Sequence, residues 1–461
     1  MSMKNFILLF FIIPFCLFSQ VNFNTNEILD INNNTYQLNS GSDFVLDNNS
    51  NAHIIYKKDS HIFYNNNING TFNNESFIDS SGHPHILIDN NDVIHIFIHK
   101  ASWVYDSNGV YVSSSQQLLY SNNSNGFFSS SLNVLPDSLV NTATSDLEIK
   151  IDYNNKIHLL ITKRPNNGFF IFDRDLYYSI LDSNSFLNPV LIDTNIESWN
   201  YSFEIDFNDD IYVFSNFYNS NFNWEVGIWS GNYNQGFSYI QNFVSNTCGQ
   251  SNKINSSLDN NGYVHYSYTV GQCAVYYGDN LNGSFSHQQY SYSFSGCASD
   301  GPKIGIDCGY SGLHIGFATC SSIQYINNLN GSFGNPIYVG SGSIGGFPTL
   351  KVDKLGKIHM FWVYTNHYIS PSTKDVYYSV SNQIVDSCNI SGCTDSAFCN
   401  YNFNACIDDG SCLNIYGCTD STALNYDSLA TCENGSCLYN VNGCTDSLAN
   451  NYNPFATVED S

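Results

Sequence analysis

Two arginines and their neighbours are the residues in this sequence whose types and spacing best suit recognition of a ligand. Arg164 and Arg174 are the only arginines among 461 residues, and Lys163 and Asp173 lie beside them in one polar segment. A cation near aromatic side chains suits an acidic or neutral sugar, because aromatic faces stack on the sugar ring. The alternative is that these four charged residues form ion pairs on the surface.

Other polar segments carry side chains of the same kinds. The ligand-binding candidates are Lys100, Trp103, Tyr105, Lys163, Arg164, Asp173, Arg174, Trp224 and His367. We expect them to surround one cleft, with simple packing of Trp224 as the alternative.

Catalysis on a carbohydrate is the second hypothesis. A polysaccharide lyase needs a base, an acid and a cation that neutralises a uronate. The candidates for these roles are His83, His85, Tyr105, Arg164 and Arg174. A glycoside hydrolase needs two carboxylates, available from Asp106, Asp173, Asp175 and Glu225. Motifs for Ser-His-Asp chemistry or nucleotide binding are missing, and we favour binding over catalysis.

A repeat spans the segments that hold these residues. Each copy has an acidic residue, a polar turn, and then an apolar residue followed by His. The seven copies run from Asp47 to His53, Asp89 to His95, Asp152 to His158, Asp206 to Tyr212, Asp259 to His265, Asp307 to His314 and Asp353 to His359. A later strand in each copy is centred on an aromatic residue: Tyr64, Tyr120, Tyr178, Trp229, Tyr277, Tyr325 and Tyr378.

The repeat predicts an all-β fold, a seven-bladed β-propeller over residues 21 to 385. Copies recur about every 40 to 60 residues, the size of a blade of four antiparallel strands. Residues 22 to 39 are candidates for completing the last blade. The pattern resembles propellers of the sialidase-like superfamily and the Asp-x-x-Gly-x-x-His blades of secreted bacterial proteins. That resemblance implies the fold and not a function.

The recurrent His is expected to be structural, because one residue repeated in every blade serves the blades and not a single site. Tyr212 takes its place in the fourth copy, which supports this interpretation. A sialidase would need three arginines to hold a carboxylate, so the resemblance does not extend to that activity.

Loop lengths predict which face carries the site. Turns between blades and loops between the second and third strands emerge on one face, and loops on a rigid scaffold usually hold binding sites. These loops are longest in blades two, three, four and seven, where the ligand-binding candidates fall. His83 and His85 are expected in the turn before the inner strand of blade two.

The N-terminus and the charge predict an exported protein. Residues 1 to 20 read as a signal peptide, and bulky Phe15 before Cys16 argues against a lipid anchor. A net charge of -25 repels nucleic acid and anionic membranes. The expected partner is therefore a glycan or a surface protein, and the expected location is outside the cell or on its outer surface.

The cysteines favour disulfides over zinc. All 15 except Cys16 follow residue 247, and none has zinc-site spacing. Within the propeller we expect Cys248 to pair with Cys273 and Cys297 with Cys320, leaving Cys308 unpaired or joined to Cys388.

Residues 386 to 461 form small repeats that need disulfides for stability. Each copy starts with Gly-Cys-Thr-Asp. Expected pairs are Cys393 with Cys412, Cys418 with Cys437, and Cys399 with Cys406. The third copy, which begins near Cys444, stops before its closing cysteine, so we expect the natural chain to continue.

The tail closely resembles the Gly-Cys-Thr-Asp...Asp-Gly-Ser-Cys repeats of secreted and surface proteins from marine Bacteroidetes-type bacteria. The resemblance implies surface display or secretion, often by a type IX route. Clustered carboxylates could also bind Ca²⁺, the only cofactor the sequence suggests. The candidate ligands are Asp395, Asp408, Asp409, Asp420 and Asp446.

Overall fold

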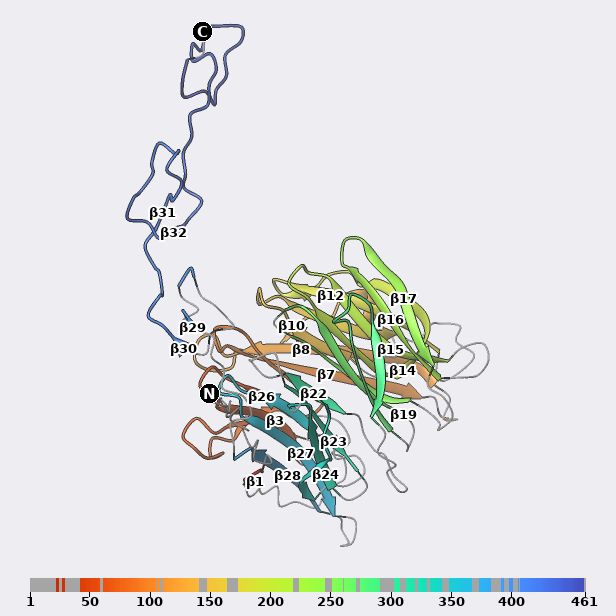
Figure 1. Cartoon of the computed structure of the whole chain (residues 1–461). Helices are drawn as coiled ribbons and strands as arrows, with labels where there is room; N and C mark the ends of the chain where they lie inside the picture. Colours follow the sequence, from red (N-terminus) through yellow and green to blue (C-terminus); the bar gives the residue numbers. More distant parts are fainter. Residues whose placement is uncertain are drawn as a thin grey trace, which may run out of the picture.

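The computed structural model has two parts, a β-propeller and a thin C-terminal stalk that runs away from it (Figure 1). It describes residues 22–24, 27–29, 42–58, 61–105, 107, 111–140, 147–163, 173–218, 224–244, 251–259, 261–270, 274–290, 302–306, 312–319, 322–329, 332–341, 348–366, 373–382, 391–393, 398–400, 405 and 407–459. The helix within these residues, α1 (Asp137–Val140), is one turn long, and no helix in this part of the chain could span a membrane.

Seven blades of antiparallel strands follow one another along the chain, as the repeat predicts. Blades one and two contain β2 (Asp43–Leu46), β3 (Ala52–Lys58), β4 (His61–Asn66) and β5 (Ser76–Asp79), then β6 (His83–Ile88), β7 (Ile94–Tyr105), β8 (Tyr111–Asn122) and β9 (Leu132–Asn133). Blades three and four contain β10 (Leu147–Ile151), β11 (Ile157–Lys163), β12 (Asp173–Asp182), β13 (Ser185–Phe186), β14 (Val190–Ile205), β15 (Ile211–Tyr218), β16 (Trp224–Asn232) and β17 (Gly236–Val244). Blades five and six contain β18 (Ser251–Leu258), β19 (Val264–Val270), β20 (Ala274–Asp279), β21 (Ser286–Tyr290), β22 (Lys303–Ile306), β23 (Leu313–Ala318), β24 (Ser322–Asn327) and β25 (Ile337–Ser341).

The N-terminus closes the ring. Blade seven contains β26 (Thr349–Val352), β27 (Ile358–Asn366) and β28 (Thr373–Val380), and its outer strand is β1 (Glu27–Leu29) from the start of the chain. The expectation that residues 22 to 39 complete this blade is confirmed at β1. Blades three and four are also joined, because the 16-residue strand β14 serves as the outer strand of one and the inner strand of the other.

The repeat marker forms a chain of three side chains, seen most fully in blade three. In blade three, Asp152 Oδ2 lies 3.1 Å from His158 Nε2, and His158 Nδ1 lies 2.5 Å from the Tyr178 hydroxyl on the third strand. Asp152 Oδ1 also accepts the backbone N–H groups of Asn154 and Lys156, which fixes the turn. The recurrent His is therefore structural, as expected.

The Asp–His hydrogen bond recurs in blades one, five and seven, and in blade two the Asp89 carboxylate lies 3.6 Å from His95 Nε2. His–Tyr contacts link His53 to Tyr64, His95 to Tyr120, His265 to Tyr277, His314 to Tyr325 and His359 to Tyr378. In blade four, Tyr212 replaces the His and hydrogen-bonds Asp206, while the Trp229 indole donates to Asp193 at 3.0 Å. We call these chains the blade staples.

Apolar side chains between neighbouring blades form the core. Blade six, for example, packs on blade seven through Ile323 and Tyr325 against Leu350 and Trp362. A Cβ atom at Gly305 would lie 2.4 Å from Leu350 Cδ2. A larger residue at that position would therefore have to displace the Leu350 side chain.

The stalk contains three disulfides in its described part. Cys393–Cys412 and Cys418–Cys437 close the first two repeats, as their spacing predicts. Cys399 is bonded to Cys432 of the next repeat and not to Cys406, so the expected pairing within the first repeat is wrong. Sequence spacing missed this link because the bond joins two repeats and not the ends of one.

Replacing one staple histidine tests the role of the staples. His53→Gln should lower the free energy of unfolding by about 1 to 3 kcal/mol, because the buried Asp47 carboxylate and Tyr64 hydroxyl lose the histidine as a hydrogen-bond partner. His61→Gln on the adjacent strand is the control, since His61 is exposed. Urea denaturation compares the two, and equal effects would show that the staple adds nothing.

The same variant should show a defined pH dependence. Burial lowers the pKa of His53 below 6.5, although the Asp47 carboxylate acts in the opposite direction. Below pH 6.5 the unfolded chain therefore binds a proton that the folded chain does not, and the stabilisation by His53 declines. The difference in unfolding free energy between wild type and His53→Gln should be largest above pH 6.5 and shrink toward pH 5. A difference that grows on acidification would contradict this assignment.

Peptide mapping without reduction tests the disulfide between repeats. A peptide joining Cys399 to Cys432 is expected beside the Cys393–Cys412 peptide, which serves as the internal control. A peptide joining Cys399 to Cys406 would restore the pairing within the first repeat.

Candidate functional site

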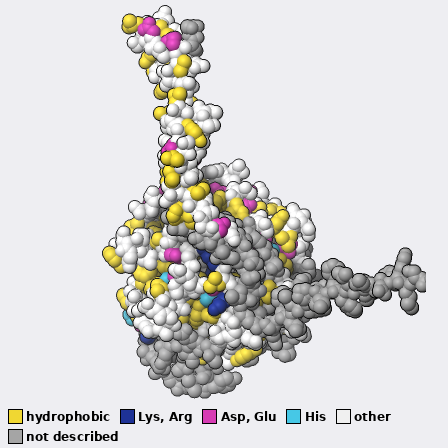
Figure 2. Space-filling model, turned by 60° about the vertical axis from the view of Figure 1, so that its left-hand side comes forward, with side chains coloured by type: hydrophobic (Ala, Val, Ile, Leu, Met, Phe, Trp, Pro, Cys, Tyr) yellow, Lys and Arg dark blue, Asp and Glu magenta, His cyan; other side chains and the backbone are white. Residues whose placement is uncertain are grey.

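The main cavity among the described residues is a channel along the propeller axis, with a volume of about 670 Å³. Inner strands of all seven blades line it. Its volume falls in the range of about 300 to 1,000 Å³ that is typical of small-ligand sites. Figure 2 shows lysine or arginine and histidine side chains gathered near the middle of the propeller.

The register of the inner strands places a ring of polar residues in this channel. The residue four positions before each repeat aspartate is polar in every blade: Asp43, His85, Glu148, Ser202, Asn255, Lys303 and Thr349. Six of them line the channel, and the seventh, Ser202, donates a hydrogen bond to Glu148 Oε1 at 3.1 Å. We call these seven residues the outer ring, because they lie toward the starts of the inner strands.

A second ring follows two residues later, since alternate side chains of a strand point the same way. It consists of Val45, Leu87, Lys150, Glu204, Ser257, Gly305 and Lys351, all of which line the channel. We call it the inner ring. The two rings together offer cations, carboxylates, hydroxyls and an amide to a bound molecule.

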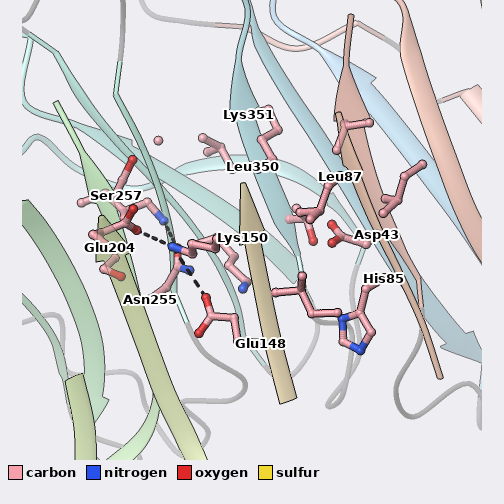
Figure 3. A pocket seen from close by; sticks show the side chains of 18 of the residues that line it. Asp43, His85, Leu87, Glu148, Lys150, Glu204, Asn255, Ser257, Leu350 and Lys351 are labelled. Carbon is pink, nitrogen blue, oxygen red and sulfur yellow. Dashed lines mark hydrogen bonds and ion pairs between the residues drawn. The ribbon is translucent and has the colours of Figure 1, made fainter. Parts of the chain in front are cut away.

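Lys150 is the centre of an ion-pair network on the side of blades three and four (Figure 3). It pairs closely with Glu204, and its Nζ lies 3.6 Å from Glu148 Oε1. Burial lowers the pKa of Lys150, but the two carboxylates outweigh this and raise it overall. Burial raises the pKa of Glu148, whose buried Oε2 atom has no hydrogen-bond partner among the described residues. Lys150 is therefore held as a cation and is largely neutralised.

The histidines expected in a turn lie in strand β6. His83 is exposed at its start, whereas His85 faces the channel (Figure 3). Removal of water lowers the pKa of His85 to about 3, helped by the nearby His99 and His83. The placement before the inner strand was therefore wrong, and His85 stays uncharged near neutral pH.

The predicted cluster of loop cations is only partly present in the described structure. Arg174 is buried at 7% exposure in β12, so its assignment to a surface loop was wrong. Lys100, expected to bind a ligand, pairs with Asp79 at 2.6 Å. Lys163 ends β11 opposite Asp175, whose pKa is raised by burial and lowered by the Lys163 charge, with burial the stronger.

The other loop candidates remain predictions. The backbones of Trp103, Tyr105, Asp173 and Trp224 lie in strands, but their side chains are outside the described part of the structure. Arg164, His367 and Asp106 lie outside the described residues altogether, as do the propeller cysteines Cys248, Cys273, Cys297, Cys308 and Cys320 and the linker residue Cys388. The described residues therefore do not bring the lyase candidates together.

The aspartates proposed as calcium ligands cap turns in the stalk. Asp420 accepts hydrogen bonds from Thr422 and from the Tyr439 hydroxyl, and Asp446 accepts the N–H of Leu448. Asp409 accepts the N–H of Ser411, and Asp395 lies outside the described residues. Within the described stalk these carboxylates do not gather into a group of three.

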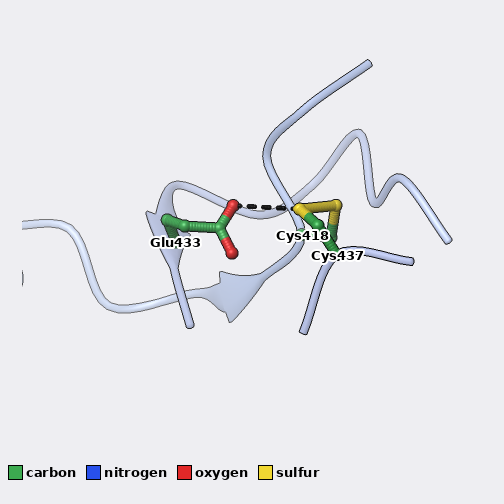
Figure 4. A group of neighbouring side chains, drawn as sticks. All are labelled: Cys418, Glu433 and Cys437. Carbon is green, nitrogen blue, oxygen red and sulfur yellow. Dashed lines mark hydrogen bonds between the residues drawn. A yellow bond between two sulfur atoms is a disulfide. The ribbon is translucent and has the colours of Figure 1, made fainter. Parts of the chain in front are cut away.

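One group in the stalk superficially resembles a metal site. Cys418, Glu433 and Cys437 lie together, but the two sulfurs form a disulfide (Figure 4). Glu433 Oε2 accepts the N–H and hydroxyl of Thr419 at 2.8 and 2.9 Å. Its role is therefore to hold the Gly-Cys-Thr-Asp turn.

Removing Lys150 tests the ion-pair network. Lys150→Met should destabilise the propeller by about 2 to 4 kcal/mol, because it leaves the largely buried carboxylates of Glu204 and Glu148 unpaired. Lys156→Met is the control, since its pair with Asp209 at 3.7 Å is half exposed and should contribute less than about 1 kcal/mol. Similar unfolding midpoints for the two variants in urea would argue against the network.

Comparison with known proteins shows the fold alone. No protein-family model and no curated protein matches the sequence. The polysaccharide lyase Uly1 is 9% identical, with 77% of this chain and 92% of that one covered and a TM-score of 0.49. An ulvan lyase bound to a glucuronate-containing saccharide is 13% identical, with 74% and 93% covered and a TM-score of 0.47. A sialidase of Trypanosoma rangeli is 11% identical, with 74% and 59% covered and a TM-score of 0.43. This chain is similar to each of them only in overall architecture.

Proposed function

We propose that the protein is a glycan-recognition propeller of the cell exterior, which admits a sugar residue of its ligand into the axial channel. The observation that carries this proposal is the outer ring, in which all seven blades contribute a polar side chain. Sugars present hydroxyl groups in several directions at once, and a ring of donors and acceptors can bind several of them together.

The outer ring departs from the rest of the scaffold in a way that favours binding. The blade staples repeat nearly unchanged, whereas the outer-ring residues differ from blade to blade. A structural role common to all blades would favour one residue type at this position. The six different side chains that line the channel instead give it the asymmetry that an asymmetric ligand requires.

Charge and disulfides are consistent with this setting. The net charge of -25 disfavours nucleic acid as a partner. Three disulfides in the stalk suit an oxidising environment, where glycans of cell surfaces and matrices are found.

A glycan array and a polysaccharide-degradation screen with the full chain test the proposal. Ser257→Tyr places a bulky ring in the channel and should weaken glycan binding at least about tenfold, as expected when a pocket is filled. Ser130→Tyr adds the same ring to an exposed position after β8 and should bind like wild type. Thr349→Val serves as a milder channel variant if Ser257→Tyr folds poorly.

Each outcome of this screen is decisive. Binding that Ser257→Tyr does not alter would move the site to the loops, where Trp103 and Arg164 are candidates. Shortened or unsaturated products would establish an enzyme. Failure to retain any glycan would overturn the proposal and favour a protein partner.

A further inference from the structure

Two lysines and an aspartate line one side of the channel, on the neighbouring blades six, seven and one. Lys303 and Asp43 belong to the outer ring, and Lys351 to the inner ring. Their strands are neighbours around the axis, because β22 contacts β26 and β26 contacts β2. These three residues are called the open cluster below.

The members of the open cluster influence one another without touching. Burial raises the pKa of Asp43, while the charges of Lys351 and Lys303 act to lower it. Burial lowers the pKa of Lys351, and Asp43 acts to raise it. Within the described structure, however, no ion pair joins Asp43 to either lysine. A space therefore separates the opposite charges.

The open cluster contrasts with the other side of the channel. There Lys150 pairs with both Glu204 and Glu148, so its charge is already satisfied within the protein. Lys351 is exposed to the channel and Lys303 is half buried, and neither has such a partner in the described part. The two lysines are thus the cations of the channel that remain available to a ligand.

A cation that lines a confined channel and forms no ion pair is free to bind an anion. Lys351 is exposed to the channel and Lys303 is half buried, so an anion placed between them could accept a charge-assisted hydrogen bond from each. The Thr349 hydroxyl, on the same strand as Lys351, and the Asp43 carboxylate could then bind hydroxyl groups beside that anion.

We propose that the open cluster binds the anionic group of an acidic sugar, a carboxylate or a sulfate, with Lys303 and Lys351 as its cationic partners. This inference rests on the proposed glycan-binding function and specifies its ligand class. The scarcity of cations adds weight, since three of the chain's 15 Lys and Arg residues lie in this channel while the net charge is -25.

Matched polysaccharides separate anion recognition from glycan binding in general. Polygalacturonate is compared with its methyl ester, and κ-carrageenan with its chemically desulfated form, so that each pair isolates the carboxylate or the sulfate. The full chain should bind one anionic member at least about tenfold more tightly than its neutral counterpart. That preference should weaken as salt is raised, because screening reduces charge attraction.

Variants assign the preference to residues. Lys303→Met, Lys351→Met and the double variant should lose most of the tenfold preference, while Lys351→Arg should retain part of it. Lys357→Met is the matched control, because it removes the same charge from blade seven outside the channel lining. Circular dichroism and unfolding midpoints check that each variant is folded.

A small-anion measurement makes the failures distinguishable. Galacturonate or sulfate, at low millimolar concentration where sulfate does not yet stabilise proteins in general, should raise the unfolding midpoint of wild type and of Lys357→Met, but not of the double variant. Equal binding of neutral and anionic polysaccharides, with no effect of small anions on the unfolding midpoint, would overturn anion binding by the open cluster and leave the proposed glycan recognition intact. A small-anion effect without polysaccharide binding would support the cluster and overturn the proposed function. Loss of preference in Lys357→Met would also contradict the assignment.

Discussion

The hydrogen-bonded chain from the turn aspartate through histidine to the third-strand tyrosine is the interaction on which the rest of the propeller depends. It links the end of the inner strand, the second strand and the third strand of one blade through buried side chains. An unpaired buried polar group costs about 1 to 3 kcal/mol, so each staple is stable only when all its members are in place. The strands of a blade are therefore fixed in a single register.

That register determines what faces the axis. Side chains alternate along a strand, and a shift of one residue would turn the whole polar ring into the packing between blades. Because the staple aspartate fixes the end of each inner strand, the residues two and four positions before it must point into the channel. The structural repeat and the site are thus connected: constant residues hold the frame, and variable residues at fixed offsets from them line the cavity.

The same relation explains what the sequence could and could not predict. The number of blades and the structural role of the histidines followed from the repeat and its spacing, whereas closure by the N-terminus was only one candidate, suggested by the short last copy. The channel residues lie two and four positions before each repeat aspartate, so the sequence does contain the signal for them. The rarity of arginine instead favoured Arg174 as a binding residue. Its burial in β12 depends on how far the strand extends beyond its apolar core, which local composition does not reveal. The Cys399–Cys432 bond likewise depends on how two repeats stack, and spacing within one repeat carries no information about that.

Charge distribution gives the channel its chemical character. The stalk from residue 386 onward has no Lys, Arg or His, whereas three lysines lie within the channel. A half-buried lysine loses part of its hydration, so a nearby opposite charge stabilises it. Lys150 forms ion pairs with two glutamates, whereas in the described part of the chain Lys303 and Lys351 form none, although Asp43 lies near enough to act on both. A network that served only the stability of the fold would be expected to pair all three lysines alike. The uneven pairing is the observation on which the proposed recognition of a negatively charged ligand rests.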